Sequence, residues 1–409
     1  MIGGITLPCQ VCSSPYTREF LDLGHHPPPL VLPTEEGLRT PETRYPLRLV
    51  QCQSCGLVQI GYTVDPKQLF LKYTYESSAS VGFARHLHQL SEHVIQKFGI
   101  SNRDLILDIG SNDGTSLEEY AKHGIRVLGV EPSNIGDLAV ARDIPTIRDF
   151  FDQRVAEQIA KTQGQAKVIT ALNVFAHVAQ LDSFVKGVDL LLEESGVFLT
   201  ESHYLLDLVS KLEYDAIYHE HLRYYSLRSL IALLERYGFT VFDAARIPTH
   251  GGSIRVYACR PGRYPVSESV KSLVDQENRA RLESFETLVD FARRVHESRL
   301  KLKCLLWKLK AGGNRIVGIS APARSSTILN YCLIGPDVLD YVVETSKIKI
   351  GRYSPGMHIP IVDESRLYTD QPEYALLLSW HLKDDIVPRI REKGYHGKFI
   401  MPLPHVEIV

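Results

Sequence analysis

Neither sign of charge dominates this sequence. Its 46 lysine and arginine side chains oppose 48 aspartate and glutamate side chains, for a formal net charge of −2. Proteins that bind nucleic acid or an anionic membrane surface usually carry a basic excess, so the balance argues against both partners. Long hydrophobic runs are also missing, and no apolar stretch approaches the ~20 residues of a transmembrane helix. Residues 1–9 show neither a charged nor a long apolar segment, so we expect no signal peptide and a cytoplasmic protein.

Cysteine is scarce, but four of the seven cysteines form two close pairs. The pairs are Cys9 with Cys12 and Cys52 with Cys55, each separated by two residues. In a reducing compartment such pairs favour a metal over a disulfide. Four thiolates complete a tetrahedral site and leave no position for a substrate, so the pattern predicts a structural zinc ion. The alternative is that these cysteines pair or merely pack. Buried structural thiols are expected at the three isolated cysteines, Cys259, Cys304 and Cys332.

The stretch from residue 105 to 133 is typical of a nucleotide-binding βαβ unit. The apolar run 105–109 leads into the pattern Asp108-x-Gly110-x-x-x-Gly114, a helical segment follows, and a second apolar run, 125–130, ends at Glu131. The glycines let the backbone approach a ligand, and Glu131 stands where a carboxylate can bind both ribose hydroxyls.

This motif resembles motif I of the class I S-adenosylmethionine (SAM)-dependent methyltransferases rather than Gly-x-Gly-x-x-Gly. Strands and helices continue to alternate through 168–172, 181–192 and 196–201. An NAD-type fold or an unrelated α/β turn is the alternative, and 149–151 is a plausible contact on the adenine side. The resemblance assigns the cofactor site to Asp108, Gly110, Asn112, Asp113, Gly114, Glu131, Pro132, Ser133 and Asn173.

The densest group of reactive side chains lies at residues 218–226. Two histidines, one glutamate, one arginine and three tyrosines occur there, and His250-Gly251-Gly252 follows downstream. A metal site is disfavoured because no cysteine is nearby. Histidine titrates near neutral pH and is the usual general base, so the group predicts proton abstraction.

The order of these blocks resembles the bacterial nucleotide-sugar C-methyltransferases, which methylate C3 of dTDP-4-keto-deoxysugars. The likeness runs from the cysteine pairs through Tyr73-x-Tyr75-x-Ser77-Ser78, the SAM motif, 218–221 and 250–252 to Pro355-Gly-x-His-Ile-Pro360. It implies that His221 is the catalytic base. Tyr218 and Glu220 would be its neighbours, and Tyr75 would be a catalytic tyrosine lent by the zinc module, although the pattern also allows Tyr73.

The resemblance also implies an α/β protein with four parts. These are a zinc-binding module at 1–80, a class I SAM methyltransferase Rossmann-like core at 81–264, a helical connector at 265–311 and a second, smaller Rossmann-like domain at 312–409 that binds the sugar nucleotide. From residue 266 to 309 the spacing of apolar residues predicts one long or two stacked amphipathic helices. Small residues open a helix near 320–327, where Arg324 could pair with a phosphate. The family often has lysine in this loop, which leaves the base or sugar in doubt. The implied substrate site comprises Tyr75, Ser77, Ser78, His250, Gly251, Gly252, Arg324, Ser325, Tyr353 and His381.

The expected function is therefore SAM-dependent methylation of C3 of an NDP-sugar, with dTDP as the expected nucleotide, through an enolate in branched deoxysugar biosynthesis. The expected partner is this small molecule, with no nucleic acid and no membrane, and the expected state is a monomer. One alternative keeps SAM but changes the acceptor, by O-methylation or with a non-sugar ketone. Another is a zinc-containing scaffold without activity.

Overall fold

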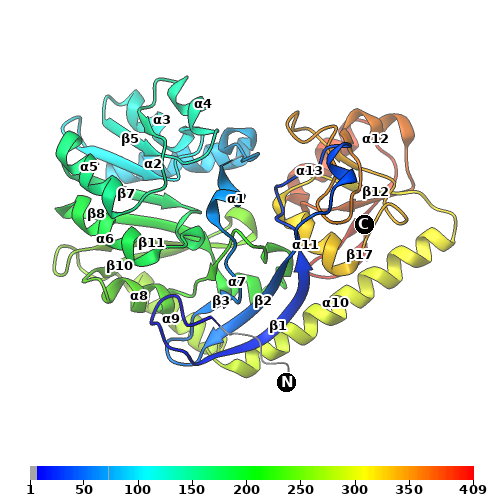
Figure 1. Cartoon of the computed structure of the whole chain (residues 1–409), viewed down its shortest axis with the longest axis horizontal. Coiled ribbons are helices and arrows are strands. Elements are labelled where there is room, and N and C mark those ends of the chain that lie inside the picture. The colour runs from blue at the N-terminus through cyan, green and yellow to red at the C-terminus, as the bar shows by residue number, and fades with distance from the viewer. Residues whose placement is uncertain (1–6, 72) are drawn as a thin grey trace.

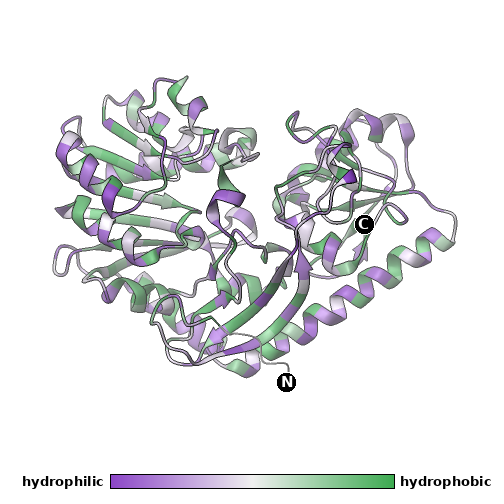
Figure 2. Cartoon of the chain, viewed as in Figure 1, coloured by the Kyte–Doolittle hydropathy of each residue, from purple (hydrophilic) through white to green (hydrophobic). Residues whose placement is uncertain are grey.

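The chain folds into two α/β lobes joined by an antiparallel sheet and a long helix (Figure 1). The computed structural model describes residues 7–71 and 73–409. Figure 2 shows hydrophobic residues concentrated on the strands inside each lobe, while the covering helices are hydrophilic on their outer faces. Every helix in the described part of the chain is too short or too polar to cross a bilayer.

The N-terminal module is a four-stranded antiparallel sheet. Its order is β1 (Thr17–His26), β2 (Tyr45–Cys52), β3 (Val58–Ile60) and β9 (Arg223–Tyr224). The last strand comes from the histidine–tyrosine segment, where Val58 pairs with Tyr224 and the Ile60 N–H donates to the Leu222 carbonyl at 3.0 Å. The module therefore shares a sheet with the segment predicted to carry the base.

The proline-rich loop between β1 and β2 reaches the C-terminal lobe. An Arg44 Nη donates to the Gly356 carbonyl at 2.9 Å, the Tyr353 N–H donates to the Pro33 carbonyl at 3.0 Å, and His358 pairs with Glu42 at 3.3 Å. This loop joins the first and last parts of the chain.

The central lobe is built on a seven-stranded sheet of order β10-β11-β8-β7-β4-β5-β6. Strands β4 (Leu105–Ile109), β5 (Arg126–Val130), β6 (Thr146–Ile147), β7 (Ala166–Leu172) and β8 (Leu192–His203) are parallel, and β11 (Ser253–Cys259) runs antiparallel to both of its neighbours, β8 and β10 (Thr240–Ile247). The helices of this region are α1 (Pro66–Phe70), α2 (Val81–Phe98), α3 (Thr115–Lys122), α4 (Gly136–Val140), α5 (Gln153–Gln163), α6 (Leu181–Leu191), α7 (Leu205–Ser210) and α8 (Leu227–Glu235). All residues of β4 are buried, as its mostly apolar sequence predicts, and the burial includes Asp108.

Two helices connect the lobes, α9 (Glu268–Arg279) and α10 (Phe285–Ala311). The apolar periodicity of this segment therefore belongs to two helices, and α10 runs from beneath the central lobe to the C-terminal lobe (Figure 1). Cys259 and Cys332 are buried as expected, but the expectation is wrong for Cys304, which is exposed. Apolar residues repeat along α10, but this pattern does not show how wide the buried face is, so a residue next to that face such as Cys304 can be exposed.

The C-terminal lobe holds a six-stranded sheet of order β14-β13-β12-β15-β16-β17. The strands are β12 (Ile316–Ile319), β13 (Val342–Glu344), β14 (Ile361–Asp363), β15 (Tyr374–Leu377), β16 (Lys398–Met401) and β17 (Glu407–Ile408), with only the β16–β17 pairing antiparallel. Its helices are α11 (Ala323–Cys332), α12 (Ser365–Asp370) and α13 (Lys383–Glu392). The parallel sheet with α11 following β12 is the second Rossmann-like domain that the sequence predicts.

Candidate active site

The four paired cysteines converge at one point. Cys9 Sγ lies 3.5 Å from Cys55 Sγ, Cys12 Sγ lies 3.5 Å from Cys52 Sγ, and all four sulfur atoms fall within 4.8 Å of one another. The backbone N–H of Cys12 donates to Cys9 Sγ, and that of Ser54 donates to Cys52 Sγ, each at 3.4 Å. The hydrogen bond between Cys9 and Cys55 lowers the pKa of the Cys9 thiol and raises that of Cys55. This donor set fits a tetrahedral zinc ion with no open position.

The predicted cofactor motif surrounds the ends of β4 and β5. Gly110 has φ of +71°, and a Cβ there would lie 2.3 Å from Val174 Cγ2, so only glycine fits this turn. Glu131 is buried and accepts from the N–H groups of Asn112 at 3.0 Å and Ser133 at 2.8 Å. These bonds hold its carboxylate at the wall of the cavity.

The nine predicted cofactor residues divide into two groups. Gly110, Asn112, Glu131, Pro132 and Asn173 line a cavity of about 760 Å³. Asp108, Asp113, Gly114 and Ser133 lie behind that wall. Asp108, for example, accepts from the Thr170 hydroxyl at 2.6 Å, and burial raises its pKa to about 6. The second group shapes the turn instead of facing the cavity.

The side chains of Asn112 and Asp113 hold the segment that carries the predicted substrate tyrosine. Asn112 Oδ1 accepts from the Ser77 N–H at 2.8 Å and its Nδ2 donates to the Tyr75 carbonyl at 3.0 Å. Asp113 Oδ2 accepts from the Ser78 N–H at 2.9 Å. The loop after β4 therefore contacts the tyrosine segment directly.

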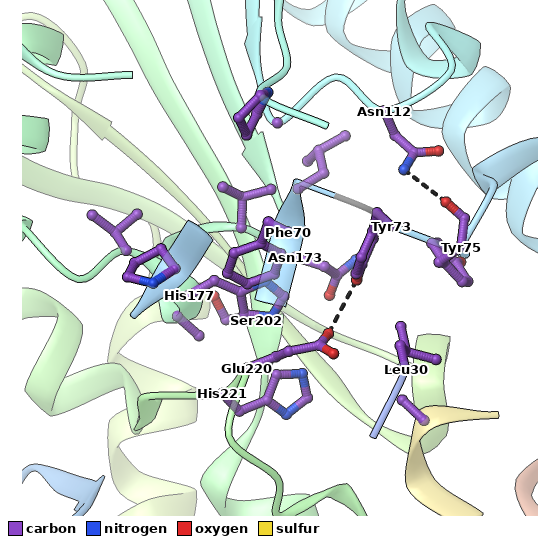
Figure 3. A pocket seen from close by; sticks show the side chains of 18 of the residues that line it. Leu30, Phe70, Tyr73, Tyr75, Asn112, Asn173, His177, Ser202, Glu220 and His221 are labelled. Carbon is purple, nitrogen blue, oxygen red and sulfur yellow. Dashed lines mark hydrogen bonds between the residues drawn. The ribbon is translucent and has the colours of Figure 1, made fainter. Parts of the chain in front are cut away.

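Tyr73 and Tyr75 both line the cavity, and they lie edge to face with centroids 6.4 Å apart. The Tyr73 hydroxyl donates to Glu220 Oε2 at 3.1 Å, and Figure 3 shows this bond directly above His221. Tyr73 therefore contacts the neighbour of the predicted base, while both tyrosines remain placed to border a substrate.

His221 lies at the floor of the cavity with one ring nitrogen engaged. Its Nδ1 is 2.9 Å from the Ala216 carbonyl and donates to it, which leaves Nε2 unprotonated and available as an acceptor. The His221 ring centroid lies 4.1 Å from that of Tyr218 and 5.0 Å from that of His177. Burial lowers the pKa of His221 well below its usual value, so the ring is neutral at neutral pH.

Glu220 is buried beside this ring, and its pKa shifts in the opposite direction. Burial raises the pKa of its carboxyl to about 8, and the hydrogen bond from Tyr73 opposes that shift only in part. At neutral pH the group is therefore mostly protonated. A neutral base and a neutral acid, adjacent in sequence, face one cavity, an arrangement that can remove a proton from carbon beside a carbonyl group.

Three family profiles match the chain, and together they cover most of its length. Residues 9–70 match a zinc binding domain, residues 83–244 a methyltransferase domain and residues 248–404 a C-methyltransferase C-terminal domain. The C-methyltransferase NovU of Streptomyces niveus is 31% identical over 404 residues, which span 98% of this chain and 96% of NovU.

The chain belongs to the C-methyltransferases. It is a SAM-dependent enzyme, and its cofactors are SAM and zinc. The ubiquinone biosynthesis O-methyltransferase of Azorhizobium caulinodans is 27% identical over 148 residues, 34% of this chain and 56% of that relative. Among solved structures, magnesium protoporphyrin IX methyltransferase from Synechocystis PCC 6803 with bound SAM matches 44% of this chain and 80% of its own, at 13% identity and a TM-score of 0.34.

The C-methyltransferase core accounts for the group of five cavity-lining cofactor residues. When bound, SAM supplies an electrophilic methyl group on sulfur. Glu131 lines the cavity where the sequence predicts the ribose, and Phe150 and Phe151 line the same cavity where the sequence predicts the adenine.

The predicted substrate residues are only partly brought together. Tyr75, Ser77, His250, Arg324 and His381 line the cavity, whereas Ser78, Gly251, Gly252, Ser325 and Tyr353 are not among the residues that do so. A Cβ at Gly251 would lie 2.6 Å from Glu213 Oε2, and one at Gly252 would lie 2.3 Å from Asp207 Cγ. These glycines make room for protein carboxylates, which explains them without a ligand, and their role toward the substrate stays a prediction.

Arg324 lines the cavity but is also held by protein acceptors. Its Nε and one Nη donate to Asp215 at 2.9 and 2.7 Å, and its other Nη donates to the His250 carbonyl at 2.7 Å. The guanidinium is buried among these acceptors, and its contact with a phosphate stays a prediction.

Other cavity residues were missed by the sequence reasoning. They are His177, Ser202, His203 and Lys349. A signal existed for His177, which follows Asn173 at the end of β7, where ligand contacts gather in parallel sheets. Ser202 and His203 end a buried strand and give no such signal, because strand residues usually read as core.

Proposed function

We propose that this C-methyltransferase adds a methyl group to C3 of an NDP-4-keto-deoxysugar, with dTDP as the expected nucleotide, through an enolate. The observation that carries the proposal is the orientation of His221. Its Nδ1 is bound to the Ala216 carbonyl, and its Nε2 is free in the cavity that Glu131 also lines. A carbon beside a ketone loses its proton because the electron pair delocalises onto oxygen. A neutral imidazole is the group suited to take that proton.

In the proposed reaction the C3 proton moves to His221 Nε2 and the electron pair of the C–H bond moves toward the 4-keto oxygen. Tyr218 and protonated Glu220 supply hydroxyl donors near the developing negative charge, and Tyr73 donates to Glu220. C3 then bonds to the methyl group as the bond between that group and sulfur breaks, which would leave its electron pair on sulfur and release S-adenosylhomocysteine, and the ketone reforms. His177 remains neutral because burial lowers its pKa to about 4, so it adds no charge beside the base.

We propose that the nucleotide extends toward the C-terminal lobe. Pro322 and Ala323 at the start of α11, Lys349 and His381 line that side of the cavity. Lys349 Nζ donates to the Ala321 carbonyl at 2.9 Å, which puts a cation beside the helix N-terminus. The N–H groups of a helix start and a lysine suit a diphosphate. His250 and Ser77 would border the sugar.

We also propose that the enzyme works as a monomer in the cytoplasm. Four thiols gathered for zinc suit a reducing compartment.

The alternative acceptors, an oxygen nucleophile or a non-sugar ketone, are distinguished by one assay. Enzyme and SAM are incubated with a panel of dTDP- and GDP-4-keto-deoxysugars, and products are read by mass. Without SAM in D₂O, C-methylation predicts deuterium at C3, whereas O-methylation predicts none.

His221→Ala is the decisive variant. Turnover and deuterium uptake at C3 should both be abolished, because no other group would accept the proton. SAM affinity, measured by calorimetry, should stay within a few-fold, since Glu131 and the β4 turn are untouched. If the variant methylates at close to the parental rate, His221 is not the base.

A further inference from the structure

The contacts of Arg324 point to the base rather than to the substrate. Residues 213–217 form a short buried turn of the central lobe that ends four residues before His221. Within it, Asp215 takes two bonds from Arg324, at 2.9 and 2.7 Å, and a third from Trp380 Nε1 at 2.7 Å. Arg324 and Trp380 both belong to the C-terminal lobe.

A second donor from the same helix holds the other end of this turn. The Thr327 hydroxyl, one helical turn after Arg324 on α11, donates to the Ile217 carbonyl at 2.6 Å. Between the two anchored residues lies Ala216, whose carbonyl accepts from His221 Nδ1. The Ala216 acceptor is therefore fixed on both sides by α11.

The electrostatic setting agrees with a structural anchor instead of a ligand site. Asp215 and Glu213 are fully buried, and an Nη of Arg324 also lies 3.2 Å from Glu213 Oε2. Burying two carboxylates costs free energy unless a cation pairs with them. A buried bidentate ion pair contributes more to a fixed geometry than to the stability of the fold. His203 Nε2 lies 3.1 Å from the same Glu213 oxygen, and the His203 ring stacks on that of His221 with centroids 6.1 Å apart.

We propose that Arg324 is a positioning residue for His221. Through Asp215 and with Thr327, it holds the Ala216 carbonyl in place, and this keeps the proton on Nδ1 and the lone pair of Nε2 toward the cavity. The inference rests on the proposed function, in which His221 is the base. It makes the C-terminal lobe part of the proton-transfer apparatus, beyond any part it plays in holding the nucleotide.

The test compares Arg324→Lys and Thr327→Val with Arg389→Lys. Lysine cannot make the bidentate bonds of arginine, and valine removes one hydroxyl at constant shape, so Thr327→Val should fold even if the charge variant does not. Arg389 is a matched control because it makes a bidentate pair with Glu364, at 2.6 Å for each bond, elsewhere in the same lobe.

The readouts are the ¹⁵N spectrum of the histidine rings in the ligand-free protein, and kcat, KM and SAM affinity. His221→Gln identifies the signals of that ring. Thr327→Val and Arg324→Lys should shift the Nδ1-protonated His221 signals toward a tautomer mixture. They should also lower kcat about tenfold or more while SAM affinity stays within twofold. Arg389→Lys should match the parent in all four readouts.

Two results would overturn the inference. One is an unchanged His221 spectrum in folded Thr327→Val. The other is a loss confined to KM for the sugar nucleotide in Arg324→Lys, which would return Arg324 to the substrate. Failure of the proposed function is distinguishable, because it would appear as turnover in His221→Gln whatever the ring spectra show.

Discussion

Two neighbouring side chains, Glu220 and His221, show how burial sets their chemistry. The same low-polarity cavity raises the pKa of the carboxyl to about 8 and pushes that of the imidazole well below its usual value, because burial disfavours the charged form of each. At pH 7 the imidazole is ready to accept a proton and the carboxylic acid can donate a hydrogen bond. Had Glu220 been ionised, its negative charge would oppose enolate formation a few ångströms away.

The activity should therefore depend on pH through Glu220. As pH rises through about 8 the carboxyl loses its proton, and kcat should fall roughly tenfold because the anion repels the developing enolate. Glu220→Gln keeps a neutral donor, so it should retain most of the activity at pH 7 and lose the alkaline fall. The measurement is kcat from pH 6 to 9.5 for parent and variant. An alkaline fall near pH 8 that persists in Glu220→Gln would assign that titration to another group.

The segment after α1 links cofactor and substrate sites. Besides the bonds from Asn112 and Asp113, the Tyr73 N–H donates to Asn134 Oδ1 at 2.9 Å. Three side chains from the loops after β4 and β5 thus hold residues 73–78, and with them the two tyrosines of the cavity. The predicted cofactor motif therefore also holds in place the two tyrosines predicted to face the substrate.

Asn112→Gly tests the contacts of the Asn112 side chain with the tyrosine segment. Asn112 has φ of +52°, which glycine adopts without strain, and the backbone N–H that binds Glu131 is retained. Two bonds to the tyrosine segment are lost, at ~1 kcal/mol each, so KM for the sugar nucleotide should rise by up to roughly 30-fold. SAM affinity should change less than threefold. Asn314→Ala, which removes a bond to the Leu309 carbonyl outside the cavity, serves as the control. A loss of SAM affinity with normal sugar KM would reverse the assignment.

Local sequence patterns predicted the helices and strands well. They could not show the contacts of side chains whose partners lie far away in the sequence. The strand ending at Asp108 and Gly110 was readable because the run of apolar residues, the turn and the helix are all contiguous. Gly251 looked like a ligand contact, yet it accommodates Glu213, which lies far away in the sequence. The phosphate assignment of Arg324 came from its neighbours in sequence, because its carboxylate acceptors Asp215 and Glu213 lie more than 100 residues upstream, where no local pattern indicates them. Which buried carboxylate meets which cation is fixed only when the lobes pack.

The three profile-matched parts of the chain build one cavity. Leu30 and Tyr73 come from the N-terminal part or its junction with the core, Glu131 and His221 from the core, and Lys349 from the C-terminal lobe. The zinc site lies outside this cavity, yet its sheet ends in β9, two residues after His221, and its long loop binds the C-terminal lobe at Gly356. Zinc therefore contributes to the shape of a site that it does not touch.

Loss of zinc should consequently affect sugar binding more than SAM binding. Cys52→Ser removes one of four ligands, so the metal and the folding free energy that it supplies to the module are lost. Elemental analysis should find one zinc per parental chain and less than about a tenth of that in the variant. Since SAM contacts belong to the core, its affinity should stay within about fivefold.

Turnover in Cys52→Ser should fall at least ~100-fold, because the β9 strand and the Leu30 loop lose their anchor. Cys304→Ser is the matched control: this cysteine is exposed on α10 and outside the cluster, so zinc content and turnover should equal those of the parent. Zinc retained in Cys52→Ser, or parental turnover without it, would contradict a structural ion that holds the module in place.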